Sequence, residues 1–273
     1  MKMDWLCERL RDRAVLLRLN AFVFSYFGWI LFGVVYAYLG RWSVNVTREF
    51  LRLPLTSREL ILSLLNTVRS IHPVYLILSW VYYLGFAGSI ALMVFYLLVY
   101  LGDLETSDQL LVRYLTAYSI AGTVYLLFHI YAPHVVYHIS GYPSGNTLLT
   151  RQEFVLPSLH NTFAAINIIT VWKYRKRLGG KALLVINTLI PFATVLLAHH
   201  WIYDVLTGFL LAIAVSRVTD GWVARIPEKL YEVELKSLRA MTMLNFVLAA
   251  LILLIALDPH RWLLLVRSIL GQP

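Results

Sequence analysis

An imidazole and a carboxylate stand four residues apart in a part of the chain that is otherwise apolar. His200 and Asp204 lie between the apolar segments 182–198 and 205–215. Ionisable groups are costly at membrane depth, so such residues are taken as functional by default. A spacing of four places both side chains on one face of a helix, close enough to touch. A carboxylate that orients an imidazole leaves the other ring nitrogen ready to attack or to accept a proton. A buried pair that only ties two helices together has the same pattern, so spacing alone leaves both interpretations open.

A second polar group, Pro157-Ser158-Leu159-His160, opens another apolar segment. Proline is favoured at the first position of a helix, where its missing N–H group would have no partner. The N–H groups of Ser158, Leu159 and His160 would then be free, and a helix N-terminus of this kind attracts phosphate. His160 in the first turn could reach the same anion. The sequence therefore predicts an anion site beside a histidine.

The composition decides which elements must carry these residues. The chain has 273 residues, of which 59% are hydrophobic and only 14% charged, whereas soluble domains carry about 25% charged residues. The composition predicts an integral membrane protein with one domain, residues 1–273. The net charge of +9 does not indicate nucleic acid, because the basic residues flank apolar spans as they do at a membrane face. The single cysteine excludes an internal disulfide and a cysteine metal cage.

A helix that crosses a bilayer needs about 20 mostly apolar residues. We therefore predict an all-α polytopic bundle of about six to seven transmembrane helices with interfacial amphipathic helices. The candidate spans are residues 19–39, 74–101, 111–132, 156–172, 182–198, 203–218 and 241–257. Between the first two spans, Thr56-Ser57-Arg58-Glu59 has the form of a capping box and predicts the start of an amphipathic interfacial helix. A second interfacial helix is expected at 229–239.

The distribution of basic residues predicts the orientation. In this arrangement, 16 of the 24 lysines and arginines lie on the side of the N-terminus, and the side richer in Lys and Arg is cytoplasmic. We therefore expect the protein in the cell membrane, with its N-terminus in the cytoplasm. The segment 133–155, the helix start at Pro157 and the His200 turn would all lie at the external or lumenal face. The anion site and the His–Asp pair would thus meet.

The two motifs together resemble the phosphatidic acid phosphatase type 2 superfamily, which also includes the vanadium haloperoxidases. Its second motif, P-S-G-H, is similar to Pro157-Ser158-Leu159-His160, and its third, S-R-x5-H-x3-D, is similar to the stretch that ends with His200 and Asp204. The resemblance covers about residues 111–218, which would form the phosphatase-like core. It favours the functional interpretation of the His–Asp pair and implies a lipid-phosphate phosphatase or phosphotransferase.

The sequence departs from the family pattern where the family carries cations. The first motif, K-x6-R-P, is absent from its expected place at 131–138, and the serine and arginine of the third motif fall on Ala193 and Thr194. Leu159 in place of glycine and the missing arginine are similar to the branch that contains inositol phosphorylceramide synthase. Its members transfer a head group between lipids and alcohols, so the acceptor could be water or an alcohol.

The resemblance implies a role for each catalytic residue. Neutral His200 would attack phosphorus and form a phosphohistidine, while Asp204 orients it and stabilises its charge. His160 would protonate the leaving alkoxide and then activate the water or alcohol. Arg151 is the sole Lys or Arg between residues 133 and 155, so it is the leading candidate to replace the missing cations. Further candidates for phosphate binding are His134, His138, His199, the backbone donors of Ser158 and Leu159, and the hydroxyls of Ser158 and Thr194.

No cofactor and no metal are expected, because the histidines lack the acid-rich spacing of a metal-binding bundle. The expected partners are the bilayer, a membrane lipid phosphate, and water or an alcohol as acceptor. Three functions remain open at this point: hydrolysis of a lipid phosphate, head-group transfer between lipids, and a non-enzymatic transporter or scaffold. The apolar spans do not identify the lipid.

Overall fold

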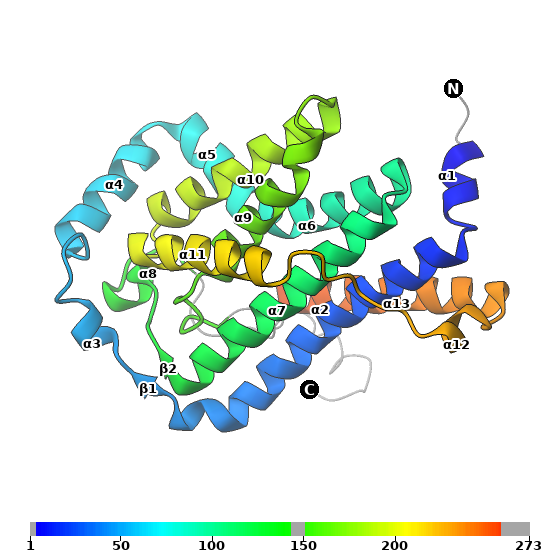
Figure 1. The fold of residues 1–273 in the computed structure, drawn as a ribbon. Helices are drawn as coiled ribbons and strands as arrows, with labels where there is room; N and C mark the ends of the chain where they lie inside the picture. The colour runs from blue at the N-terminus through cyan, green and yellow to red at the C-terminus, as the bar shows by residue number, and fades with distance from the viewer. Residues whose placement is uncertain (1–3, 143–150, 258–273) are drawn as a thin grey trace, which may run out of the picture.

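The computed structural model describes residues 4–142 and 151–257, and this part of the chain is a bundle of helices (Figure 1). The predicted all-α class is confirmed for these residues. One small addition was not predicted: strands β1 (Val44–Asn45) and β2 (Phe128–His129) pair in parallel. Residues 143–150, within the predicted external segment 133–155, lie outside the described residues.

The helices follow one another along the chain, with the longest connection between residues 136 and 159. In chain order they are α1 (Asp4–Arg9), α2 (Arg13–Leu39), α3 (Thr47–Phe50), α4 (Arg58–Ser70), α5 (His72–Trp80), α6 (Phe86–Val94), α7 (Leu104–Leu127), α8 (Pro133–Val136), α9 (Leu159–Val171), α10 (Leu178–Leu196), α11 (Ile202–Val218), α12 (Glu228–Tyr231) and α13 (Leu235–Leu257). The π-helical turns η2 (Val81–Gly85) and η3 (Phe95–Leu101) follow α5 and α6 without interruption, and 3-10 turns at Gly40–Trp42 (η1) and Trp172–Tyr174 (η4) follow α2 and α9.

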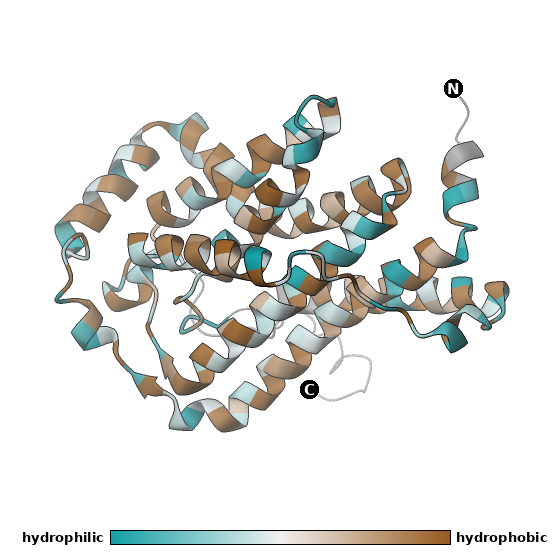
Figure 2. Cartoon of the chain, in the orientation of Figure 1, coloured by the Kyte–Doolittle hydropathy of each residue, from teal (hydrophilic) through white to brown (hydrophobic). Residues whose placement is uncertain are grey.

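Among the described residues, 5 helical segments are long and apolar enough to cross a membrane. These are Arg13–Trp42, His72–Leu101, Leu104–Leu127, Leu178–Leu196 and Leu235–Leu254. They fall on five of the seven predicted spans and make this an integral membrane protein. Figure 2 shows hydrophobic residues along the long helices and hydrophilic ones gathered at their ends and in connecting segments.

The other two predicted spans form shorter helices. Helix α9 has 13 residues and α11 has 17, whereas a rise of 1.5 Å per residue requires about 20 residues to cross the bilayer. Helix α9 starts late because Ser158, not Pro157, caps it: the Ser158 side chain accepts a hydrogen bond from the Asn161 N–H. The expectation that Pro157 occupies the first helical position was therefore wrong by two residues.

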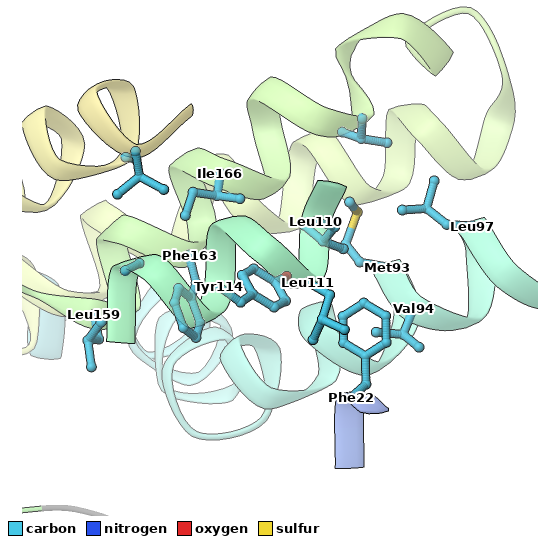
Figure 3. Close-up of a cluster of buried hydrophobic side chains, with 14 of the residues drawn as sticks. Phe22, Met93, Val94, Leu97, Leu110, Leu111, Tyr114, Leu159, Phe163 and Ile166 are labelled. Carbon is cyan, nitrogen blue, oxygen red and sulfur yellow. The ribbon is translucent and has the colours of Figure 1, made fainter. Parts of the chain in front are cut away.

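Helix α9 is the centre of the bundle and packs against α7, α10 and α11. Its side chains Phe163 and Ile166 are almost fully buried, and Phe163 stacks on Tyr114 of α7 with 4.5 Å between ring centroids (Figure 3). A helix that is apolar on most faces is stable only when neighbours surround it. This packing sets the position of the α9 N-terminus, which carries His160.

The two predicted interfacial segments differ in outcome. Helix α4 begins after the N-cap Ser57 and buries Ile61, Leu65 and Val68 on one face, as the amphipathic pattern indicates. The segment 229–239 is not one helix, because a break separates α12 from α13. Tyr231 and Val233 pack against Leu16 and Leu17 of α2 at this break, so tertiary contacts override the local helical pattern.

Candidate active site

The start of α9 and the turn between α10 and α11 bring two histidines together. The His200 Nε2 atom lies 3.4 Å from His160 Nδ1 and 3.4 Å from the Ser158 hydroxyl oxygen. About 40 residues of the chain separate His160 from His200. The packing of the helices therefore brings the two side chains into contact. We call Ser158, His160, His200 and Asp204 the histidine site.

The contact between His200 and Asp204 depends on a turn rather than on one helix face. His200 precedes α11, and its N–H shares the Thr194 carbonyl with that of His199. The Asp204 Oδ2 atom accepts the Trp201 N–H at 2.7 Å and lies 3.4 Å from His200 Nδ1. The carboxylate therefore holds the first turn of α11 and faces the imidazole with the same oxygen. Asp204 is 0% exposed and His200 is 3% exposed.

At the N-terminus of α9, one of the backbone donors that the sequence predicts for phosphate binding already has a hydrogen-bond partner. The Ser158 N–H donates to the Asp204 carbonyl oxygen at 3.3 Å, which ties α9 to α11. The Tyr125 hydroxyl donates to the Pro157 carbonyl at 2.5 Å and so anchors the segment before the helix. These bonds fix the distance between the two histidine-bearing elements.

Asn161 belongs to this site, although the sequence analysis did not select it. Its side chain is fully buried, and its Nδ2 group donates to the Ser158 hydroxyl at 2.9 Å and to the Thr194 hydroxyl at 3.1 Å. Thr194, which stands where the family has its arginine, thus links α10 to the N-cap of α9. A buried amide within an apolar segment is a signal that could have identified Asn161 from sequence.

Tyr82 is a second residue that the sequence analysis missed. It lies in the π-helical turn η2, and its ring stacks on His199 with 3.7 Å between centroids and on His160 with 5.3 Å. Such π-helical turns are frequent at functional sites. No sequence signal distinguishes Tyr82 from its neighbours Tyr75 and Tyr83, because its role depends on how α5 and α6 pack against the bundle.

Two further predicted histidines, His134 and His199, lie at the turn that carries His200. His134 Nδ1 lies 3.0 Å from the Ala198 carbonyl oxygen, and its ring centroid is 5.2 Å from that of His199. His138 is placed after α8 with a positive φ of 51°. His134 and His199 therefore surround the turn that carries His200, and their role in binding phosphate remains a prediction.

Burial keeps the turn histidines neutral near pH 7. It lowers the pKa of His200 to about 4 and also lowers the pKa of His134. The pKa of His199 falls well below its usual value, because burial disfavours its charged form and three other histidines lie nearby. A neutral imidazole is the form that can act as a nucleophile.

Arg151, the leading candidate cation, is engaged with other groups. Its Nη2 donates to the Gly33 carbonyl at 3.1 Å, its Nη1 lies 3.6 Å from Glu153 Oε1, and the guanidinium lies over the Tyr36 ring. These contacts connect it to α2 and to Glu153. Its role as a phosphate ligand stays a prediction and would require the side chain to leave Gly33. Within the described ranges, no group of three or more His, Cys, Asp or Glu side chains could hold a metal ion.

Part of the chain is similar to known proteins. Residues 109–228 match the model of the PAP2 superfamily. Uncharacterized protein MJ0662 of Methanocaldococcus jannaschii is 25% identical over 201 residues, which are 73% of this chain and 81% of the relative. No solved structure matches the chain. The matched segment contains the histidine site and Asn161, whereas Tyr82 lies outside it.

Proposed function

We propose that this protein is a lipid-phosphate phosphatase or phosphotransferase that acts through a phosphohistidine at His200, because residues 109–228 match the model of the PAP2 superfamily. One observation carries the proposal: the His200 Nε2 atom lies 3.4 Å from His160 Nδ1 while its Nδ1 lies 3.4 Å from Asp204. One ring nitrogen thus faces an acid–base group and the other a carboxylate.

In the first step, the lone pair of His200 Nε2 attacks phosphorus, and the bond from phosphorus to the lipid oxygen breaks. An arriving phosphate favours a protonated imidazole nearby, so His160 takes up a proton on binding and gives it to the leaving oxygen. Asp204 stabilises the positive charge that His200 gains when the phosphorus–nitrogen bond forms. Positioning and charge stabilisation account for most of the catalysis in phosphoryl transfer.

In the second step, His160 accepts a proton from water or from an alcohol, whose oxygen then attacks phosphorus. The phosphorus–nitrogen bond breaks and His200 returns to its neutral form. Free phosphate or a new phosphorylated alcohol leaves. The protein carries the same groups for both acceptors, so the acceptor is decided by which molecule reaches the site.

The phosphate charge needs partners in both steps. Arg151 is proposed to turn from Gly33 toward the phosphate, with His134, His138 and His199 as further donors. The N–H groups and hydroxyls at Ser158, Leu159 and Thr194 complete the set. By the distribution of lysine and arginine, this chemistry takes place at the external or lumenal face, with the N-terminus in the cytoplasm.

Trapping of the phosphoenzyme tests the proposal. Purified full-length protein is mixed with phosphatidic acid labelled with ³²P, quenched in base, and assayed for an acid-labile protein adduct and for released phosphate. His200→Ala is expected to lose both signals, whereas the matched variant of an exposed histidine, His72→Ala, keeps both. An adduct and a release rate that are unchanged in His200→Ala would refute the mechanism and favour a transporter or scaffold.

The acceptor is decided by a second measurement on the same protein. Release of free phosphate without any added alcohol supports hydrolysis. A labelled phosphorylated alcohol that forms only when an alcohol such as inositol is added supports transfer.

A further inference from the structure

A cavity of about 310 Å³ lies at the other end of the helix pair α9–α11. Its lining comes from α7, α9, α11 and the turn after α11: Arg113, Ile169, Ile213, Ser216, Arg217 and Asp220. Along α9, Ile169 is nine residues beyond His160, and along α11, Ser216 is twelve residues beyond Asp204. At 1.5 Å per residue the cavity is about 14–18 Å from the histidine site. We call Arg113, Ser216 and Arg217 the arginine end.

Two polar atoms at this cavity are buried without a hydrogen-bond partner in the part of the chain that the structure describes. These are Arg113 Nε and the Ser216 hydroxyl oxygen. Both residues are only 8% exposed, and the Arg113 guanidinium donates through Nη1 to the Thr170 hydroxyl at 3.1 Å. Burial of a charged donor without a partner is unfavourable. The Nε atom has almost no exposed surface, so an acceptor in the cavity would complete the hydrogen bonding of Arg113 only when the guanidinium turns toward it.

The charged residues around the cavity indicate what charge a bound acceptor would carry. Arg113 and Arg217 contribute two positive charges and Asp220 one negative charge, and Asp220 lies close enough to act electrostatically on Arg113. The net charge of +1 matches a ligand with a single negative charge, and the Asp220 carboxylate disfavours a phosphate dianion. Guanidinium groups bind phosphate oxygens with paired, charge-assisted hydrogen bonds. The chemistry fits a phosphodiester.

The walls of the cavity add an apolar component. Ile169 is 39% exposed and Ile213 is 42% exposed, so both offer hydrocarbon surface beside the charged groups. Both belong to helices packed within a bundle of candidate membrane spans, and basic pockets between membrane helices bind anionic head groups. We propose that the arginine end binds the phosphodiester head group of an anionic phospholipid from the leaflet opposite the histidine site. This inference does not rest on the proposed catalytic function.

Lipid binding by full-length protein in detergent tests the inference. Dioctanoyl phosphatidylglycerol is titrated and the bound lipid is counted by native mass spectrometry, with dioctanoyl phosphatidylcholine and inorganic phosphate as parallel ligands. We expect one phosphatidylglycerol to bind at least tenfold more tightly than either other ligand. Inorganic phosphate that binds as tightly as phosphatidylglycerol, or phosphatidylcholine that does so, would overturn the assignment of an anionic lipid.

Single-residue variants test whether phosphatidylglycerol binds at the arginine end. Arg113→Gln and Arg217→Gln should each weaken the binding of phosphatidylglycerol about tenfold or more. Arg217 is exposed, so its variant keeps the test valid should Arg113→Gln fail to fold. Arg225→Gln, at an exposed arginine that follows α11 and is not among the cavity-lining residues, should leave the affinity unchanged. Equal affinity of the wild type and Arg217→Gln would refute the site.

Discussion

The two ends of the α9–α11 pair carry polar groups of different chemistry. At the histidine site and the adjoining Asn161, the buried atoms without a hydrogen-bond partner among the described residues are Asn161 Oδ1, Asp204 Oδ1 and His200 Nδ1. At the arginine end, the unpaired groups include the donor Arg113 Nε. The first end carries two imidazoles that change protonation in the proposed reaction, whereas the second carries the permanent charge of a guanidinium. One helix pair therefore separates a place suited to moving protons from a place suited to holding an anion.

The largest expected effect tests the charge at the first end. Asp204→Asn can keep the oxygen that accepts the Trp201 N–H, but it removes the negative charge beside His200. Turnover should fall about 10²–10⁴-fold, because the developing imidazolium loses its stabilising partner. The measurement is the rate of phosphate release under saturating lipid, with Glu59→Gln on the exposed side of α4 as the control. A loss smaller than tenfold would remove the distinction between the two ends.

A smaller effect tests the close approach of α9 and α11. A Cβ atom at Gly208 would lie 2.8 Å from the Ser158 carbonyl oxygen and 3.1 Å from Asn161 Cβ. Gly208→Ala must therefore push α11 away from α9, which should lower stability by about 1–3 kcal/mol and reduce turnover by separating His200 from His160.

Thermal unfolding in detergent measures the stability change, and Gly28→Ala is the matched control. A Cβ at Gly28 meets nothing within 4 Å, and alanine is the better helix former. If Gly208→Ala melted at or above the temperature of Gly28→Ala, close packing at Gly208 would not position the site.

The smallest effect, counted per pH unit, is the pH dependence of stability. Burial lowers the pKa of His200 from 6.5 to about 4 in the folded protein, so between these values the unfolded chain binds more protons. Stability should therefore decrease as the pH falls from about 6.5 toward 4, by at most about 1.4 kcal/mol per pH unit for this group.

Melting temperatures at pH 7, 6 and 5 reveal this slope. His200→Gln should show a shallower decrease than the wild type. Arg217→Gln should keep the full slope, because a guanidinium does not titrate in this range. Parallel slopes in all three proteins would mean that His200 is not a neutral buried group in the folded state.

Some features of the site depended on contacts that no local pattern contains. The short α9 follows from the cap at Ser158, and the stacking of Tyr82 on His199 joins segments that are 117 residues apart in the chain. Arg151 was selected because it is a lone cation in its segment, but its guanidinium contacts Gly33 on α2. Residue type and spacing describe what a side chain can do, whereas the rotamer and the neighbouring helices decide what it contacts.

The sequence by itself determined that the chain is helical with spans apolar enough for a membrane, and it selected His160, His200 and Asp204 as the residues proposed to carry its chemistry. Apolar length and the cost of an ionisable group in a membrane are local properties, which residues reveal without their neighbours. Only the tertiary structure decided the amide link from Asn161 to Thr194 and the meeting of Arg113, Ser216 and Arg217 around one cavity. These groups come from helices far apart in the chain, and their convergence depends on how the helices pack.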